Sequence, residues 1–361
     1  MTISELTNSD LSNFISFCKK NLPKSFVYEK NFLNYWFKDK KNNWSIDIVK
    51  NKRKKIISIN IRIINEAIFK KKIIPMVWTS TAFTSLQNNK DPYIGLILYQ
   101  IHKNNKIVGS ISPNSYSIKL NKQLGNNLNG IKLQRYIYIH NHEFRKLIIK
   151  SKKNLFNKFK SIKIKKNKLG FKSKWIKHIP VEYNKLWKKF SSRFDLCTNK
   201  DYKFIKKRYL DNPFQKYDFL KVTDSSNKLI GLSIIRFQTF NKIKFARIIE
   251  FISLKKYDKF VWNEIIYNCQ INGATISDFF VIGNNQNQNL KDLGFKKMIN
   301  YNKFYHIPNL LSPLSHRHWN ENFHIGGNKI NKDNKKTIKN IWFTKGDGDR
   351  DHPTRYDLKI N

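Results

Sequence analysis

Cysteine is scarce in this 361-residue chain, and Cys18, Cys197 and Cys269 lie far apart without a CxxC or Cys/His spacing. This pattern argues against a disulfide framework and a cysteine-based zinc site, and it favours a reducing compartment. No apolar run approaches the roughly 18 residues that a membrane span needs. The N-terminal residues also lack a basic flank followed by an apolar stretch. The sequence therefore predicts a cytoplasmic protein without a membrane span.

Acidic residues are few, whereas basic residues are abundant. The chain has 70 Lys and Arg residues against 25 Asp and Glu residues, a formal net charge of +45. Such a charge indicates a nucleic acid or another anionic partner, but a genome rich in A and T would also raise lysine, asparagine and isoleucine together. The basic residues concentrate once, in residues 145–189, where Glu182 is the single acid. Both interpretations stay open, and the even spread of lysine elsewhere does not favour nucleic acid.

The chain is long enough for two domains, and its hydrophobic fraction of 40% is sufficient for real cores. Residues 32–63 can be aligned with residues 204–237, which indicates an internal repeat. Three aligned pairs illustrate the match: Trp44 with Tyr217, Val49 with Val222, and Lys55 with Lys228.

Each copy predicts the same order of elements: a helix, three antiparallel strands, a helix, a strand, a helix and a closing strand or strand pair. The first copy's strands are expected at residues 44–49, 55–64, 72–79, 107–111 and 132–140, and the second copy's at 217–222, 228–237, 244–253, 274–282 and 296–307. Asp91 and Asp258 mark the start of the middle helices. The predicted domains are residues 1–145 and 181–312, with a basic linker at 146–180 and a tail at 313–361.

The end of each copy carries an asparagine followed, about ten residues later, by Leu-Gly. Asn114 precedes Leu124-Gly125, and Asn284 precedes Leu293-Gly294-Phe295. Together with the order of elements, this pattern resembles the GCN5-related N-acetyltransferase (GNAT) superfamily, present as a tandem pair. The resemblance implies an α+β fold of two tandem GNAT-like units, each with a mixed, mostly antiparallel sheet flanked by helices.

In this family the fourth and fifth strands diverge and leave backbone groups that pair with the pantetheine arm of an acyl-CoA, while the next helix N-terminus receives the pyrophosphate. The resemblance therefore implies acetyl-CoA or another acyl-CoA as co-substrate, and no metal. The family's glycine-rich pyrophosphate segment is absent from both copies. The implied cofactor-binding residues are Thr79, Ser80 and Asn114 in the first copy, and Ile252, Ser253, Leu254 and Asn284 in the second.

Glu250 and Tyr116 are the two candidate catalytic residues. Glu250 lies in the strand predicted at residues 244–253, which corresponds to the family's fourth strand. Some family members place there the base that takes a proton from the acceptor amine, and the apolar neighbours of Glu250 would raise its pKa. Tyr116 lies at the start of the helix that follows the strand at residues 107–111, which corresponds to the family's fifth strand. The alternatives are an ion pair with Arg247 or a lysine for Glu250, and packing for Tyr116. Where many members carry a tyrosine acid, this chain has Asn121 and Leu290.

The resemblance implies an acyl-CoA-dependent N-acyltransferase, an N-acetyltransferase in the simplest case, in which an amine attacks the thioester directly. Tandem members are associated with surface polysaccharide and cell-envelope synthesis, which suggests a small-molecule amine or sugar acceptor, such as an amino sugar of a polysaccharide precursor. The alternative is a noncatalytic GNAT-like protein that binds an anionic glycan or nucleotide. A nucleic-acid module is the third hypothesis.

The C-terminal stretch FTKGDGDRDHP, residues 343–353, places Asp347, Asp349 and Asp351 at alternate positions. An EF-hand is excluded because His352 and Leu358 stand where the loop needs glycine and a bidentate glutamate. Alternating glycine and aspartate are typical of turns. The stretch also resembles the C-terminus of polysaccharide-associated family members, and it is predicted to be a turn outside both units that docks on the second.

Overall fold

The computed structural model describes residues 2–23, 25, 27–34, 44–85, 93–111, 115–124, 128, 131–141, 170–240, 243–283, 287–297, 323–330, 332–348 and 351. The chain divides into two compact units. Unit 1 comprises residues 1–132, 320–339 and 347–361, and unit 2 comprises residues 133–319 and 340–346. Each has a mixed sheet with flanking helices, which agrees with the predicted α+β class.

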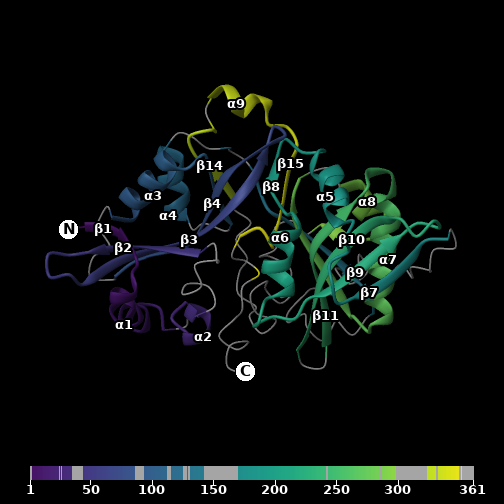
Figure 1. Cartoon of the computed structure of the whole chain (residues 1–361), viewed down its shortest axis with the longest axis horizontal. Coiled ribbons are helices and arrows are strands. Elements are labelled where there is room, and N and C mark those ends of the chain that lie inside the picture. The colour runs from purple at the N-terminus through teal and green to yellow at the C-terminus, as the bar shows by residue number, and fades with distance from the viewer. Residues whose placement is uncertain are drawn as a thin grey trace, which may run out of the picture. The chain divides into compact units, whose positions relative to one another are not determined.

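Unit 1 has helices on both faces of its sheet (Figure 1). In spatial order its strands are β1 (Thr2–Glu5), β2 (Trp44–Lys50), β3 (Ile56–Phe69), β4 (Lys72–Thr84), β5 (Ile107–Ile111) and β14 (Phe323–Gly326). β4 and β5 are parallel, and the other neighbours are antiparallel. The helical elements are η1 (Asn8–Asp10), α1 (Leu11–Asn21), α2 (Lys30–Leu33), α3 (Tyr93–Asn104), α4 (Ser115–Gln123) and α9 (Lys332–Thr337). α1 and α2 cover one face, and α3 and α4 cover the other (Figure 1).

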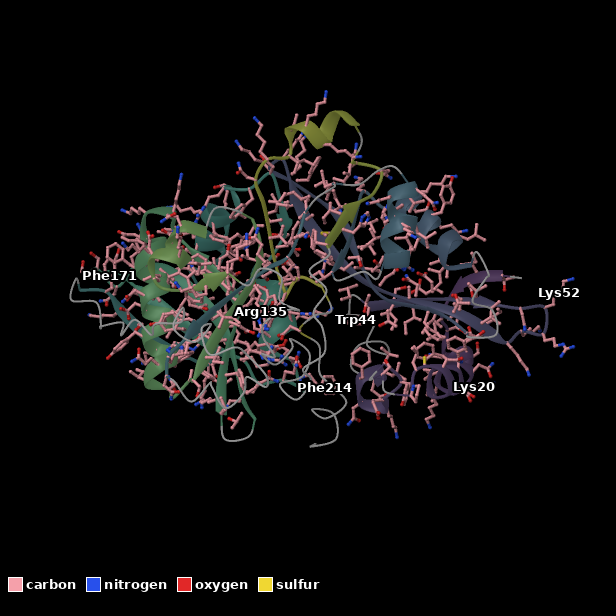
Figure 2. All side chains as sticks on the ribbon, turned by 180° about the vertical axis from the view of Figure 1, so that it is seen from behind. Lys20, Trp44, Lys52, Arg135, Phe171 and Phe214 are labelled. Carbon is pink, nitrogen blue, oxygen red and sulfur yellow. The ribbon has the colours of Figure 1, made fainter. Side chains whose placement is uncertain are left out.

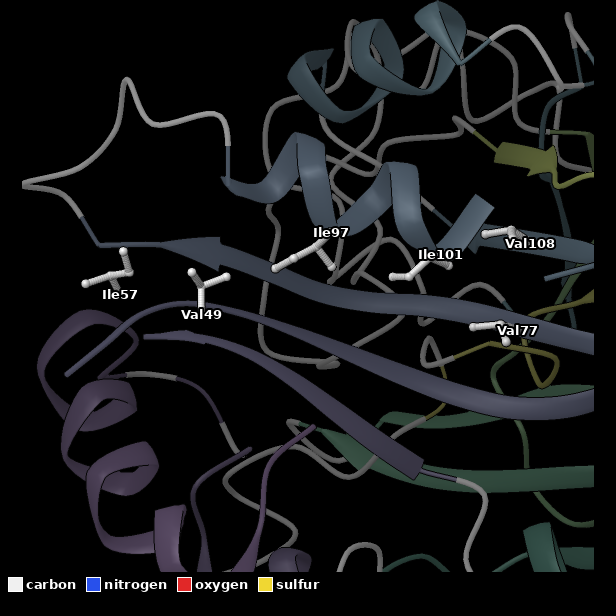
Figure 3. Packing of buried hydrophobic residues seen from close by; sticks show 6 residues of the cluster. All are labelled: Val49, Ile57, Val77, Ile97, Ile101 and Val108. Carbon is white, nitrogen blue, oxygen red and sulfur yellow. The ribbon is translucent and has the colours of Figure 1, made fainter. Parts of the chain in front are cut away.

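One hydrophobic cluster of unit 1 lies between α3 and the sheet (Figure 3). Ile97 and Ile101 stand four residues apart and therefore share one face of α3. They pack on four buried strand residues, Val49, Ile57, Val77 and Val108. Burial of each such side chain contributes about 1.5–3 kcal/mol, so this cluster fixes the helix that follows β4.

Unit 2 repeats the order of three antiparallel strands followed by a parallel one. In spatial order its strands are β7 (Lys172–Ile176), β9 (Asp218–Thr223), β10 (Leu229–Phe240), β11 (Ile243–Ser253), β12 (Ile276–Ile282), β6 (Gln134–Ile139) and β13 (Lys296–Lys297). β15 (Ile341–Thr344) pairs with β12 and with β8 (Leu196–Thr198). The helical elements are α5 (Tyr183–Ser191), α6 (Tyr202–Ile205) with a π-helical turn (Lys206–Leu210), η7 (Lys255–Tyr257), α7 (Asp258–Ile271) and α8 (Asn287–Asp292).

The first hairpin of each unit has the same geometry at the positions that the sequence alignment pairs. Asn51 Oδ1 accepts the backbone N–H of Lys55 at 3.0 Å, and Asp224 Oδ1 accepts that of Lys228 at 3.0 Å. The residue before each lysine has φ of 58°. Both hairpins also contain a bulge, and the two bulges are at aligned positions. In unit 1 the bulge falls between Val49 and Lys50 of β2, and in unit 2 it falls opposite the two residues of β9 that align with them. The matching turns support the internal repeat.

Several strands lie elsewhere than the sequence predicts. β6, expected to close the first copy, pairs with β12 of unit 2. β7 lies in the predicted basic linker but extends the sheet of unit 2. β14 and β15 lie in the predicted tail, yet each pairs within a unit. The unit boundaries therefore differ from the predicted ranges, because pairing between segments so distant in sequence leaves no local pattern. None of the described helices is long and apolar enough to cross a membrane.

Candidate functional site

β4 and β5 diverge in unit 1. Their parallel pairing ends at Thr79 and Ser110, although β4 continues to Thr84. Ser80 and Thr81 form a bulge against β3 at the same point, and such bulges redirect a strand next to many active sites. Among the described residues no strand pairs with the β5-facing edge of β4 beyond Thr79. A strand edge of this kind can pair with the amide groups of an extended ligand.

Two of the predicted donor-binding residues lie at this divergence. Thr79 is buried, and its Oγ1 donates to the backbone oxygen of Gly109 at 3.3 Å, while Ser80 is half-buried. The Trp78 ring covers Gly109 so closely that a Cβ there would lie 2.5 Å from it. The position therefore requires glycine. The predicted residue Asn114 and the side chain of Tyr116 lie outside the described part of the chain.

The equivalent divergence in unit 2 is closed by the chain itself. β11 and β12 stop pairing at Ile248 and Phe279. Beyond that point Val281 of β12 pairs with Thr344 of β15 on one edge and with Gln134 of β6 on the other. Because β6 and β11 lie on opposite edges of β12, β15 occupies the space between β11 and β12. This space corresponds to the β5-facing edge of β4 beyond Thr79 in unit 1.

Glu250, the predicted base, lies beside β15 and is fully buried. Lys200 Nζ donates to both carboxylate oxygens, at 2.9 Å and 2.7 Å. The hydroxyl groups of Tyr209 and Thr344 donate to one oxygen each, at 2.6 Å and 3.1 Å. Gly346, two residues after Thr344, lies so close to Tyr209 that a Cβ at this position would be 2.1 Å from the Tyr209 hydroxyl oxygen. This geometry is that of a buried ion pair sealed by the C-terminal strand, and it favours a structural role for Glu250.

The start of α7, where an acyl-CoA pyrophosphate was expected in unit 2, holds a carboxylate instead. Arg193 donates to both oxygens of the buried Asp258, at 3.1 Å and 2.6 Å. The Ser253 hydroxyl also donates to Asp258. A negative side chain at a helix N-terminus occupies the position that an external anion would take.

The other cofactor-binding residues predicted in unit 2 are enclosed by this arrangement. Ile252 and Ser253 are fully buried, and the Ser253 backbone oxygen accepts a hydrogen bond from Arg193 at 3.4 Å. The Leu254 N–H donates to Ile230 at 2.9 Å. Asn284 lies outside the described residues. The described part of this region thus presents a filled groove.

The C-terminal stretch FTKG also supplies a buried cation to unit 2. Lys345 Nζ lies 3.9 Å from Asp278 Oδ1, and Arg135 binds Asp278 Oδ2 at 2.7 Å. Arg247 stands 3.7 Å from the same carboxylate. Burial alone would raise the pKa of Asp278, but Lys345, Arg247 and Arg135 together lower it to about 2. β15 is therefore anchored by charge as well as by backbone pairing.

Unit 1 contains a carboxylate that the sequence analysis missed. Asp47 of β2 binds Arg62 Nη2 at 2.7 Å and accepts the Asn60 amide at 3.1 Å, both from β3. Desolvation raises its pKa despite these favourable partners. Asn60 in turn pairs with Ala82 of β4, just beyond the bulge. A single aspartate within an apolar strand pattern gave no signal, because its partners come from a neighbouring strand.

Two buried histidines also meet in unit 1. The rings of His102 on α3 and His324 on β14 are 5.2 Å apart. Burial lowers the pKa of His102 to about 4, against a smaller opposing effect of a hydrogen bond with Asn121. Burial and the neighbouring His102 lower the pKa of His324 to about 3. Both rings are neutral at pH 7, and no metal-binding group of His, Cys, Asp and Glu side chains occurs among the described residues.

The arrangement of strands and helices is shared with solved acyltransferase structures. A conserved protein of Enterococcus faecalis V583, a "Probable N-Acyltransferase", matches with a TM-score of 0.58 at 8% identity, over 91% of this chain and 72% of its own. A GCN5-related N-acetyltransferase of Anabaena variabilis ATCC 29413 matches with a TM-score of 0.56 at 9% identity, over 77% and 65%. This chain has the GNAT fold.

A third match is the N-myristoyltransferase of Saccharomyces cerevisiae with bound myristoyl-CoA. Its TM-score is 0.52 at 12% identity, over 82% of this chain and 80% of that one. No family model and no curated protein matches the sequence. At identities of 8–12% the likeness is one of fold.

Proposed function

We propose that this chain is an acyl-CoA-dependent N-acyltransferase in which unit 1 binds the acyl donor. The observation that carries the proposal is the end of the β4–β5 pairing at Thr79, next to a bulge, in a chain with the GNAT fold. We infer that unit 2 is a second GNAT-like copy whose groove holds β15 in place of a donor. Its role is then structural.

The proposed chemistry needs little from the protein beyond positioning. The edge of residues 80–84 orients the donor as an added strand, and residues at the bulge polarise the thioester carbonyl. The acceptor nitrogen forms a bond to the carbonyl carbon, the carbon–sulfur bond breaks, and the sulfur leaves as the thiolate of CoA. The proton lost by the amine passes to a base or to water.

For that base we propose Asp47, acting through water. Its raised pKa makes it a better proton acceptor, and its side chain is 13% exposed, whereas Glu250 is sealed by Lys200 and Tyr209. The earlier prediction of Glu250 as base stays testable. An Asp47→Asn variant should lower kcat and change its pH profile, whereas Glu250→Gln should mainly lower stability. Loss of turnover in a stably folded Glu250→Gln protein would favour the earlier prediction.

We propose an amine as acceptor, in keeping with the names of the matching N-acyltransferases. An amino sugar of a surface polysaccharide precursor stays the prediction for its identity. Release of free CoA from acetyl-CoA and longer acyl-CoAs, with amino sugars and N-terminal peptides as acceptors, would rank these classes. Donor binding without transfer to any amine would support the alternative of a noncatalytic binding protein.

Hydrogen exchange with mass spectrometry tests the assignment of the donor to unit 1. Acetyl-CoA at millimolar concentration should slow exchange of amides in residues 79–84 and 107–111, because the donor pairs with or covers this edge. Amides in residues 248–254 should exchange at an unchanged rate, since β15 already covers them. Protection in unit 2 alone would contradict the assignment, and no binding of any acyl-CoA would contradict the proposed function.

A further inference from the structure

Unit 1 contains a pocket of about 720 Å³ beside the end of β4. It lies between α1, the β2–β3 connection and Ser85. Its floor is apolar, with the buried side chains of Phe17 and Ile56, and its walls are polar. A volume of ~300–1,000 Å³ with an apolar floor and a few polar groups is typical of small-molecule sites.

The polar walls of this pocket are cationic. Lys20 of α1 and Lys55 of the β2–β3 connection both line it, and the lining includes no acidic side chain. Neither lysine forms an ion pair with a described residue. Asp10 at the start of α1 is already bound by Lys50 at 2.5 Å. Figure 2 shows Lys20 on α1 and Lys52, a further cation, at the tip of the connection. Gathered positive charge of this kind attracts an anion.

Unit 2 shows what can occupy the corresponding place. The backbone N–H groups of Ser85 and Leu254 each donate, at 2.9 Å, to the aligned isoleucine of the preceding hairpin, so the two residues are equivalent. Beside Leu254, Arg193 follows the end of α5, as Lys20 lies at the end of α1. Arg193 is neutralised by the carboxylate of Asp258. Unit 2 thus carries its own anion where unit 1 has an open pocket.

We propose that the pocket of unit 1 binds an organic phosphate. Lys20 and Lys55 bind the phosphate oxygens, while the hydroxyl of Ser16 and the amide of Asn13 donate from the same helix. Phe17 supports the apolar part of the ligand, and its ring is itself held by Phe83 of β4 at 6.2 Å. The phosphate belongs either to the nucleotide end of an acyl-CoA or to a phosphorylated acceptor.

Calorimetry on the full chain tests this site with adenosine 3′,5′-bisphosphate, glucosamine 6-phosphate and inorganic phosphate as probes. At least one organic phosphate should bind, and Lys20→Gln/Lys55→Gln should weaken its binding at least about tenfold. The matched control, Lys103→Gln/Lys119→Gln, removes the same charge from exposed positions of unit 1 and should leave the affinity unchanged. Rising salt should weaken the binding.

Competition identifies the source of the phosphate. Displacement of the bisphosphate by acetyl-CoA would assign the pocket to the donor, and independent binding of the sugar phosphate would assign it to the acceptor. The inference is overturned if no organic phosphate binds at millimolar concentration, or if both double variants lose affinity equally. Acetyl-CoA binding is measured separately, so that the proposed function and the phosphate site are tested independently of each other.

Discussion

The two units treat the same divergence of strands in opposite ways. In unit 1 the parallel pairing of β4 ends at Thr79, and residues 80–84 are half-buried. In unit 2 the pairing of β11 ends at the equivalent Ile248, and residues 249–253 are all buried beside β15. One fold therefore offers either an edge for a ligand or a place for its own C-terminal strand. The difference depends on β15, which lies some 90 residues further along the chain.

The charged residues of the two units differ in the same way. Unit 2 fills its groove and its helix N-terminus with internal partners, the Lys200–Glu250 and Arg193–Asp258 pairs. In unit 1, Lys20 and Lys55 line a pocket and form no ion pair with any residue that the structure describes. Internal carboxylates in one unit thus mark where external anions are expected in the other. The comparison yields three predictions, given from the largest expected effect to the smallest.

Removing the cation of the buried Lys200–Glu250 pair in unit 2 should have the largest effect on stability. Lys200→Met leaves the fully buried carboxylate of Glu250 without its cation, which should cost about 3–5 kcal/mol of the free energy of unfolding. Urea denaturation measures it. The control is Lys206→Met, which removes the exposed partner of Asp211 and should change stability little. Equal losses in both variants would show that the Lys200–Glu250 pair contributes no more than a surface pair.

The outcome of the sequence predictions follows from the range of the contacts involved. The first three strands of each predicted copy were predictable, because alternating apolar residues and the turns at Asn51 and Asp224 are local signals. The divergence at Thr79 followed from the resemblance to a known fold. By contrast, the enclosure of Glu250 by β15 depends on Thr344, 94 residues away, and Asp47 acquires its partners across a strand pair. Neither contact leaves a pattern within one segment.

Two glycines provide a matched test of which unit binds the donor. A Cβ at Gly109 would lie 2.5 Å from the Trp78 ring, and one at Gly231 would lie 2.6 Å from Val261. Each alanine variant should lose about 1–3 kcal/mol of stability through overpacking. Calorimetry should show weaker acetyl-CoA binding for Gly109→Ala alone, because Gly109 lies where the pairing of β4 and β5 ends, whereas Gly231 pairs with Ser253 inside the sheet of unit 2. Weaker donor binding in Gly231→Ala alone would point to unit 2 instead.

The buried histidines should give unit 1 a steeper loss of stability in mild acid than unit 2. An unfolded histidine has a pKa near 6.5, whereas His102 and His324 in the folded chain have pKa values of about 4 and about 3. Between these values the unfolded chain binds more protons, so the free energy of unfolding rises with pH and is lost as pH falls below about 6.5. At pH 5.5 each ring accounts for roughly 1.4 kcal/mol.

In unit 2, His140 donates to or accepts from Ser277 at 2.7 Å, and burial lowers its pKa to about 3. The slope of the free energy of unfolding against pH, measured between pH 7 and pH 5, should therefore fall by the equivalent of about two protons in His102→Gln/His324→Gln. It should fall by the equivalent of about one proton in His140→Gln. The slope is independent of any constant loss of stability that the substitutions cause in the core. An unchanged slope in the double variant would mean that the two histidines titrate alike in the folded and the unfolded chain.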